Sequence, residues 1–240
     1  MMAIPHGGAY AGAMTTESGS DDRVLESWHK NATAWTRAVR EQHIESRRLV
    51  TDAAIVDAVL DRSPQTVLDI GCGEGWLVRA LASRGVRGTG VDAVPALVEQ
   101  AKRLGQGHFS VASYEAIAEG VLAETADVIV ANFSLIGHES VNRLVRHVPS
   151  LLSPRGAFVV QTLHPVVACG DQPYVDGWRD GSWAGFDKEF TDPAPWYFRT
   201  LGSWLGLLDG AGLRVVSLGE PLHPVTQKPA SMVLTAVAVG

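Results

Sequence analysis

The sequence predicts an α/β fold around a mostly parallel sheet, and three observations lead to this prediction. A short apolar run at 67–70 stops at three glycines placed at alternate positions within 71–75, and residues 77–82 then carry apolar side chains at helical spacing. A second apolar segment ends in Asp92, about 20 residues beyond the glycines. Strand-like and helix-like segments alternate along most of the remaining chain. This order is typical of doubly wound sheets.

The segments before the glycines are predicted to be helical. Residues 22–48 form one or two helices, with a patch at 31–34 where the path could bend, and residues 49–60 carry apolar side chains at helical spacing. Pro64 keeps Ser63 out of helical geometry, so the helix that precedes the first strand ends before it.

The alternation continues after Asp92. Pro95 at a helix start, an apolar stripe and Gly105 predict a helix between them. The other expected elements are strands at 109–111, 128–131 and 157–163, a helix at 201–211 closed by Gly212, and two final strands at 213–218 and 232–239.

The glycine loop has a physical use in binding. Glycines let a ligand approach the main chain closely, and the start of the following helix supplies free N–H groups and a partial positive charge. Asp92 lies where dinucleotide folds place an acid that accepts hydrogen bonds from ribose hydroxyls. These features predict a nucleotide-like ligand whose ribose carries no phosphate.

At this point the chain resembles the class I S-adenosylmethionine-dependent methyltransferases. The resemblance rests on D-x-G-x-G-x-G from Asp69 to Gly75, on Asp92, and on the acid-led segment 127–133, and it covers most of the chain from about Val56 onward. It implies a Rossmann-like seven-stranded sheet, mostly parallel with an antiparallel C-terminal strand and helices on both faces. It also implies S-adenosylmethionine as the cofactor, without a metal. A nicotinamide-binding loop would read G-x-G-x-x-G, which this spacing does not match.

The resemblance implies a set of cofactor-binding residues. The acidic residue usual beside the adenine is absent from 112–114, so an adenine amino contact would come from Ser113, a main-chain group or water, while Tyr114 could stack. The N-P-P-Y/F signature of amide and exocyclic-amine methyltransferases is also absent, because Phe133 and Ser134 replace both prolines. The implied cofactor residues are Asp69, Gly71, Cys72, Gly73, Asp92, Ala93, Ser113, Tyr114, Asn132 and Phe133.

Composition narrows the class of protein. The 240 residues suit one α/β domain with additions, and a net charge of −6 without a dense Lys/Arg run disfavours nucleic acid as a partner. The two cysteines have no metal-binding or disulfide pattern, and no stretch is long and apolar enough to span a membrane or to form a signal peptide. We therefore expect a cytoplasmic protein without a membrane partner, monomeric or homodimeric.

Three regions are expected along the chain. Residues 1–20 are small, Gly-rich and aperiodic, which predicts a flexible tail, with Met14 as a possible natural start. Residues 21–60 form a helical cap, to which Trp35 belongs. Residues 61–240 form the methyltransferase domain, interrupted at about 165–200 by an aromatic-rich segment that we expect to be a lid.

The lid and the strand ends supply the catalytic candidates. Aromatic walls suit a flat or apolar acceptor, so Trp35, Trp178, Trp183 and Tyr197 are predicted to line the acceptor pocket. A hydroxyl or ammonium acceptor must lose a proton, and a histidine suits that role. His164 ends a predicted central strand and is the first candidate; His138, which follows 128–131, is the second, and His223 is the third.

The sequence thus predicts methyl transfer from S-adenosylmethionine to an oxygen or nitrogen of a small molecule, with release of S-adenosylhomocysteine. Two alternatives stay open. One is a nicotinamide-dependent oxidoreductase, which shares the fold topology, and the other is a protein that binds S-adenosylmethionine without transferring its methyl group.

Overall fold

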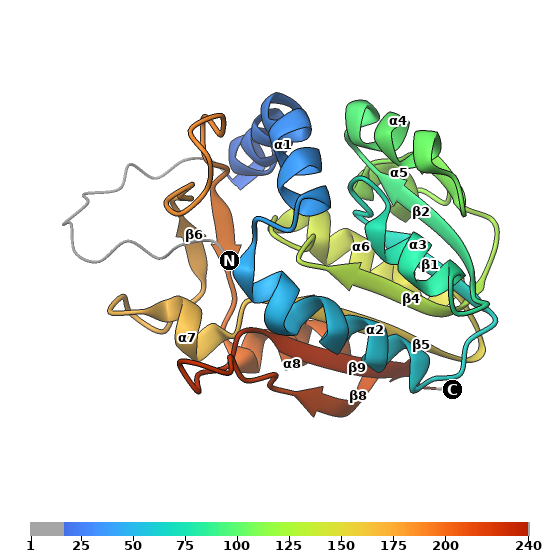
Figure 1. Ribbon diagram of the computed structural model, residues 1–240. Helices are drawn as coiled ribbons and strands as arrows, with labels where there is room; N and C mark the ends of the chain where they lie inside the picture. Colours follow the sequence, from blue (N-terminus) through green and yellow to red (C-terminus); the bar gives the residue numbers. More distant parts are fainter. Residues whose placement is uncertain (1–16, 240) are drawn as a thin grey trace.

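The computed structural model describes residues 17–239 and confirms the predicted α/β sheet. Seven strands lie in the order β3-β2-β1-β4-β5-β9-β8 (Figure 1). β9 pairs antiparallel with both β5 and β8, and the first five strands of the chain pair parallel. The strands are β1 (Thr66–Ile70), β2 (Arg87–Asp92), β3 (His108–Val111), β4 (Ala126–Asn132), β5 (Leu152–Thr162), β8 (Leu213–Gly219) and β9 (Met232–Ala238).

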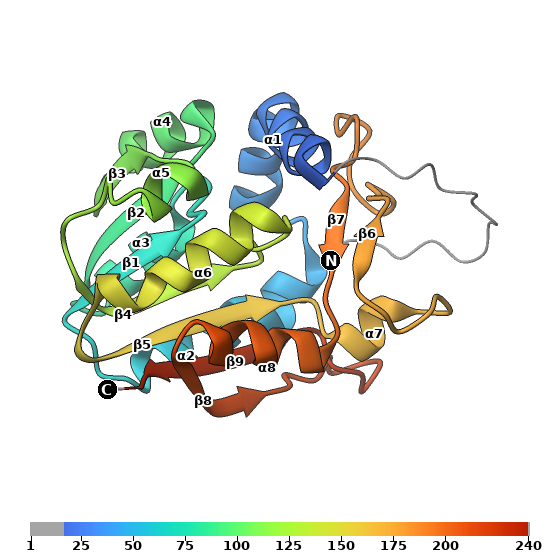
Figure 2. The same ribbon diagram turned by 180° about the vertical axis from the view of Figure 1, so that it is seen from behind.

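Helices cover both faces of this sheet, which explains the continuous apolar runs in the central strands. The helices α2 (Asp52–Leu60) and α3 (Trp76–Ala82) pack on one face. The opposite face is covered by α5 (Tyr114–Ala118), α6 (Glu139–Leu151) and α8 (Leu201–Gly210), as Figure 2 shows. Successive side chains of β1 point to opposite faces of the sheet. Val67 packs with α2 and α3 on one face, and Leu68 packs in the core formed with α5, α6 and α8 on the opposite face. The helix α4 (Pro95–Leu104) lies beside α3 and β3.

The N-terminal region differs from the prediction in where its helix begins. Of the predicted tail, residues 1–16 lie outside the described part of the chain, and α1 (Glu17–Arg40) begins at Glu17 rather than at residue 22. Of the two alternatives left open for this region, the structure has one unbroken helix through 31–34 and not two helices separated there. Asn31 does not interrupt it, because its side-chain amide donates to the Ser27 carbonyl one turn earlier (2.8 Å).

The helix predicted at 49–60 consists of two parts. It begins with a single π-helical turn, η1 (Arg47–Thr51), and continues as α2. A π-helical turn is wider than an α-helical one and turns side chains in directions that a regular helix does not offer. Arg47 and Thr51 acquire their orientation from this turn.

β5 begins earlier than predicted, at Leu152 rather than at residue 157. Leu152 pairs with Ala126, and the register then shifts between Ala126 and Val128. Arg155 takes up this irregularity with a φ of 68°, a left-handed conformation that sequence periodicity does not reveal.

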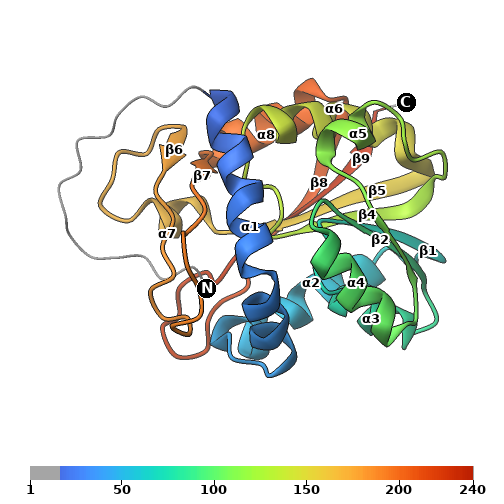
Figure 3. The ribbon, with the colours of Figure 1, turned by 90° about the horizontal axis from the view of Figure 1, so that it is seen from above.

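The segment at 165–200 folds as a short helix α7 (Pro165–Cys169) followed by β6 (Gly177–Arg179) and β7 (Trp196–Phe198), which pair as a separate two-stranded sheet. Figure 3 shows α1 lying between this sheet and the main sheet. Asn31 joins α1 to the segment by accepting from the Thr191 amide (2.9 Å) and donating to its carbonyl (2.7 Å). None of the helices within residues 17–239 is long and apolar enough to cross a bilayer.

Candidate active site

The glycine loop between β1 and α3 packs closely against Ser134, two residues beyond the end of β4. Gly71 has a φ of +76°, and a Cβ there would lie 2.3 Å from Cβ of Ser134. Ser134 is itself fixed, because its Oγ donates to the Ile70 carbonyl (2.7 Å). The loop is fixed to β2 as well, since the Gly71 and Cys72 amides both donate to the Val91 carbonyl. Only glycine fits at position 71.

Asp92 closes the same loop from the end of β2. Its Oδ2 accepts from the Gly73 amide (2.8 Å) and its Oδ1 accepts from the Val94 amide (2.9 Å). Burial raises the pKa of Asp92, and these two N–H groups oppose that shift because they stabilise the carboxylate. The side chain is therefore held in one orientation at the carboxyl edge of the sheet.

Asp69 lies beneath the loop and is only 2% exposed. Its Oδ1 has no hydrogen-bond partner among the described residues. Burial, and secondarily the charge of Asp92, raises the pKa of Asp69 to about 8. A neutral carboxyl group at this position avoids placing two negative charges together in the interior.

A pocket opens over the loop and is called the loop pocket below. It lies between α1 and the carboxyl ends of β1, β2 and β4. Eight of the ten predicted cofactor residues line it: Gly71, Gly73, Asp92, Ala93, Ser113, Tyr114, Asn132 and Phe133. Asp69 does not line it, and Cys72 lines a second pocket described below.

The side chains of Ser113 and Tyr114, the two predicted adenine contacts, already make local hydrogen bonds. The Ser113 hydroxyl caps α5 by accepting from the Ala116 amide (3.2 Å). The Tyr114 hydroxyl donates to the Ser134 carbonyl (2.9 Å), and burial raises its pKa. Tyr114 thus braces the glycine loop from the β4 side. The predicted adenine contacts of both residues stay predictions.

Phe133 is strained at the point where the loop pocket meets its neighbour. Its φ is 53°, an unfavourable conformation for a bulky side chain, and its amide donates to the Gln161 carbonyl (2.8 Å). It follows Asn132 at the end of β4, and both residues line the two pockets. Strain of this kind clusters at functional sites.

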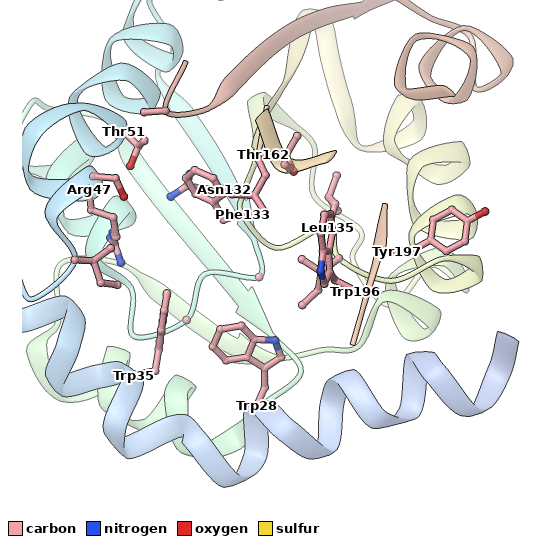
Figure 4. A pocket seen from close by; sticks show the side chains of 18 of the residues that line it. Trp28, Trp35, Arg47, Thr51, Asn132, Phe133, Leu135, Thr162, Trp196 and Tyr197 are labelled. Atoms are coloured by element: carbon pink, nitrogen blue, oxygen red, sulfur yellow. The ribbon is translucent and has the colours of Figure 1, made fainter. Parts of the chain in front are cut away.

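The second pocket, the aromatic pocket, adjoins the first. Six of the seven tryptophans line it, and so do Phe133, Phe186, Tyr197 and Phe198. In Figure 4, Arg47 and Thr51 lie on one side of this pocket and Trp196 and Tyr197 on the other, with Asn132 and Phe133 between. The six tryptophans are Trp28, Trp35, Trp76, Trp183, Trp196 and Trp204.

Three of the four predicted acceptor-pocket residues line the aromatic pocket: Trp35, Trp183 and Tyr197. Trp178 does not, and it packs edge-on against Tyr197 with ring centroids 5.5 Å apart. Trp178 therefore supports a wall of the pocket from behind.

The candidate histidines do not line either pocket. His164 is 8% exposed, and its Nε2 lies 2.6 Å from Oε1 of Glu220, while its neighbours Leu163 and Pro165 line the aromatic pocket. His138 stacks on Tyr197 with ring centroids 3.9 Å apart. A catalytic role for either one stays a prediction.

Sequence reasoning missed several pocket residues. Arg47, Thr51 and Trp76 line the aromatic pocket on one side, and Arg199 also lines it. No motif marks them, because their position depends on how η1 and the segment at 165–200 pack. Of these four residues, only Trp76 could have been predicted from the sequence to line the pocket, because it directly follows the glycine loop. No group of three or more metal-ligating side chains is found among residues 17–239.

Comparison with known proteins agrees with this architecture. A family model described as a methyltransferase domain matches residues 25–218. An uncharacterized methyltransferase of Schizosaccharomyces pombe is 28% identical over 172 residues, which cover 67% of this chain and 64% of that protein. The malonyl-[acyl-carrier protein] O-methyltransferase of Anoxybacillus flavithermus is 27% identical over 154 residues, 62% of this chain and 56% of that protein. The chain therefore matches less than two thirds of the length of these relatives.

Solved structures share the fold at lower identity. The 1,6-didemethyltoxoflavin-N1-methyltransferase of Burkholderia thailandensis superposes with a TM-score of 0.68 at 19% identity, covering 96% of this chain and 94% of that one. An S-adenosylmethionine-dependent methyltransferase of Mesorhizobium loti gives 0.58 at 22% identity, over 75% and 94% of the two chains. The chain belongs to the methyltransferase-domain family, and its fold is that of the class I S-adenosylmethionine-dependent methyltransferases.

Proposed function

We propose that this protein transfers a methyl group from S-adenosylmethionine to an oxygen or nitrogen of a small molecule. The observation that carries the proposal is that the loop pocket and the aromatic pocket adjoin at the glycine loop. Gly71, Gly73, Asn132 and Phe133 line both. A donor in one pocket and an acceptor in the other would meet at this junction.

The residues of the loop pocket fit the proposed cofactor. Gly73 leaves room beside the main chain, since the one atom within 4 Å of an added Cβ is Nε1 of Trp35 at 3.6 Å, so a ligand can lie against the backbone there. Asp92 can accept hydrogen bonds from ribose hydroxyls through its remaining lone pairs, since each carboxylate oxygen already accepts only one amide N–H. Acids placed in this way bind ribose in dinucleotide folds.

Bound S-adenosylmethionine would supply a methyl carbon already activated by a sulfonium, so that the C–S bond breaks as the acceptor lone pair forms the new bond. The protein then has to align the acceptor and exclude water. Trp28 and Trp35, on α1, line both pockets and cover the junction from one side. The proposal also includes two covering segments: residues 21–60 act as a cap, and residues 165–200 act as a lid over the acceptor site.

The acceptor must also lose a proton, and we keep His164 as the first candidate for the base. If Nε2 of His164 carries the proton and donates it to the Glu220 carboxylate, Nδ1 is the nitrogen that can accept a proton. Histidines oriented by a carboxylate act as bases in this way. Nδ1 is buried and has no hydrogen-bond partner among the described residues. The neighbouring residues Leu163 and Pro165 line the aromatic pocket, so a shift of this segment that keeps the Glu220 contact would bring Nδ1 to the acceptor. His138 is the second candidate.

The nature of the acceptor atom remains part of the proposal. Of the proteins compared above, one is named for O-methylation and another for N1-methylation. Methylation at oxygen and methylation at nitrogen are both compatible with the aromatic pocket, because none of its lining side chains selects one acceptor atom over the other. We further propose that the protein works in the cytoplasm, as a monomer or homodimer. The net charge of −6 disfavours a nucleic acid substrate.

Calorimetry and a transfer assay test the proposal. S-adenosylhomocysteine is expected to bind with about 1:1 stoichiometry, and NADH is expected not to bind. A panel of phenols, amines and carboxylates is then screened for S-adenosylhomocysteine release from S-adenosylmethionine. Binding of NADH alone would favour an oxidoreductase. S-adenosylhomocysteine binding without transfer to any acceptor would favour a protein that binds the cofactor without catalysis.

A further inference from the structure

Arg47 and Thr51 of η1 form a polar corner of the aromatic pocket. Both residues line the pocket and lie on the same side of it in Figure 4. The indole rings of Trp35 and Trp76, which also line the pocket, lie against the Arg47 guanidinium. A polar corner within aromatic walls can orient a ligand by one charged or polar group.

Arg47 is held rigidly and still has a free donor. Its guanidinium carbon lies 4.7 Å from the ring centroid of Trp76 and 5.9 Å from that of Trp35. Its Nε and Nη2 donate to the Asp52 carboxylate at 2.9 and 3.4 Å. Its Nη1 makes no hydrogen bond with any residue between 17 and 239, although the side chain is only 11% exposed. A guanidinium fixed in this way can bind an anion with little loss of entropy.

Thr51 adds a second polar group to this corner of the pocket, a buried hydroxyl. The residue is 1% exposed, and its Oγ1 has no hydrogen-bond partner in the described part of the chain. A buried hydroxyl without a partner costs about 1–3 kcal/mol. It lines the pocket beside Arg47, so a ligand oxygen could satisfy it.

The charges around the pocket favour an anion. Its lining contains Arg47, Arg199 and Glu74. Glu74 is already paired with two arginines, Arg40 and Arg79.

Arg199 is 4% exposed and has only neutral acceptors among the described residues: the Gly137 and His138 carbonyls and Oδ1 of Asn142. Burial lowers its pKa to about 10, so it stays charged at neutral pH. Among the side chains that line the pocket itself, two arginines therefore stand against one carboxylate.

We propose that the acceptor is a flat aromatic molecule carrying a carboxylate, which Arg47 binds through Nη1 and Thr51 binds through its hydroxyl. The ring system lies between the tryptophan walls, with the atom to be methylated toward Asn132. An aromatic carboxylate matches the walls, the free guanidinium donor and the unsatisfied hydroxyl at once. This inference rests on the proposed methyltransferase function.

The test compares 2-naphthoate with 2-naphthamide, which have the same ring and nearly the same shape. Both are titrated calorimetrically into the full-length protein, with and without saturating S-adenosylhomocysteine. The acid is expected to bind at least about tenfold more tightly than the amide, because a charge-assisted hydrogen bond is about twice as strong as a neutral one.

Variants assign the preference to the polar corner. Arg47→Gln should reduce the preference for the acid to about twofold or less. Thr51→Val should weaken acid binding severalfold without lowering the unfolding temperature, because the lost hydroxyl has no partner in the free protein. Arg143→Gln removes an exposed arginine of α6 that pairs with Glu139, and it should change nothing.

Each outcome decides one point. Equal affinity for acid and amide, or an unchanged preference in Arg47→Gln and Thr51→Val, would overturn the carboxylate proposal even where S-adenosylhomocysteine binds normally. A retained acid preference without any S-adenosylhomocysteine binding would overturn the methyltransferase proposal instead.

Discussion

The Nε atom of Arg40, near the end of α1, lies 2.9 Å from Oε2 of Glu74 in the glycine loop. The Glu74 side chain is fully buried, and Nη2 of Arg79 lies 2.7 Å from its other oxygen. Arg40 also donates to the side chain and main chain of Gln100 on α4. One buried carboxylate therefore ties the N-terminal helix to the loop that forms both pockets.

Glu74→Gln should destabilise the protein by about 3 kcal/mol, because it leaves two partly buried arginines without their counter-charge. Urea denaturation measures the change. Glu99→Gln is the matched control: its carboxylate is 60% exposed and pairs with Lys102, so the loss should stay below about 0.5 kcal/mol. Equal effects in the two variants would contradict a structural role for Glu74.

Gly71→Ala should cost more than about 2 kcal/mol and weaken S-adenosylhomocysteine binding at least about tenfold. The added Cβ would meet Ser134 at 2.3 Å, and the positive φ adds backbone strain. Gly85→Ala separates the two causes, since Gly85 has a φ of +85° but no atom within 4 Å of its added Cβ. It should cost only about 1–2 kcal/mol and leave binding intact. Thermal unfolding and calorimetry report both quantities.

Asp92→Ala should weaken S-adenosylhomocysteine binding by about 10- to 100-fold, since hydrogen bonds to a charged group contribute about 1.5–3 kcal/mol. Asp92→Asn keeps the side-chain shape and tests the charge alone. The exposed Asp57→Ala, on α2, serves as the control. Wild-type affinity in Asp92→Ala, measured by calorimetry on folded protein, would contradict the proposed ribose contact.

Stability should fall as the pH rises from about 4 to 8, because the pKa of Asp69 is about 8 in the folded protein, far above the ordinary aspartate value of 3.8 that applies in the unfolded chain. Across this range the folded state binds a proton that the unfolded state has released, and the raised pKa of Asp92 acts in the same direction.

Asp69→Asn cannot titrate and should flatten this part of the profile. Urea denaturation at several pH values compares the two proteins. Asp61→Asn, at an exposed position after α2, should keep the wild-type slope. A wild-type slope in Asp69→Asn would show that Asp69 is ionised in the folded protein.

His164→Ala should lower kcat at least about 100-fold and leave S-adenosylhomocysteine affinity unchanged, if the side chain removes the acceptor proton. The rate is measured with the best acceptor from the panel. Glu220→Gln should lower kcat less, because it only orients the ring through the 2.6 Å contact. His138→Ala is the comparison, and an unaffected rate in His164→Ala would transfer the role to His138 or remove the need for a base.

The sequence by itself determined the sheet and the loop pocket, because both depend on local constraints. Apolar runs and glycines at alternate positions define the β1–α3 junction, and parallel strands bring their carboxyl ends to one edge. Asp92 and Asn132 could thus be placed together without a structure. Most of the predicted cofactor residues line one pocket for this reason.

Only the tertiary structure decided the polar corner and the tie between α1 and the loop. Arg47 and Thr51 reach the aromatic pocket through a π-helical turn, and Glu74 meets Arg40 from 34 positions away. Trp178 likewise packs behind the pocket wall, although it comes from the same aromatic-rich segment as Trp183. Such contacts depend on how separate segments dock, and side-chain periodicity within one segment carries no information about the segment against which it will pack.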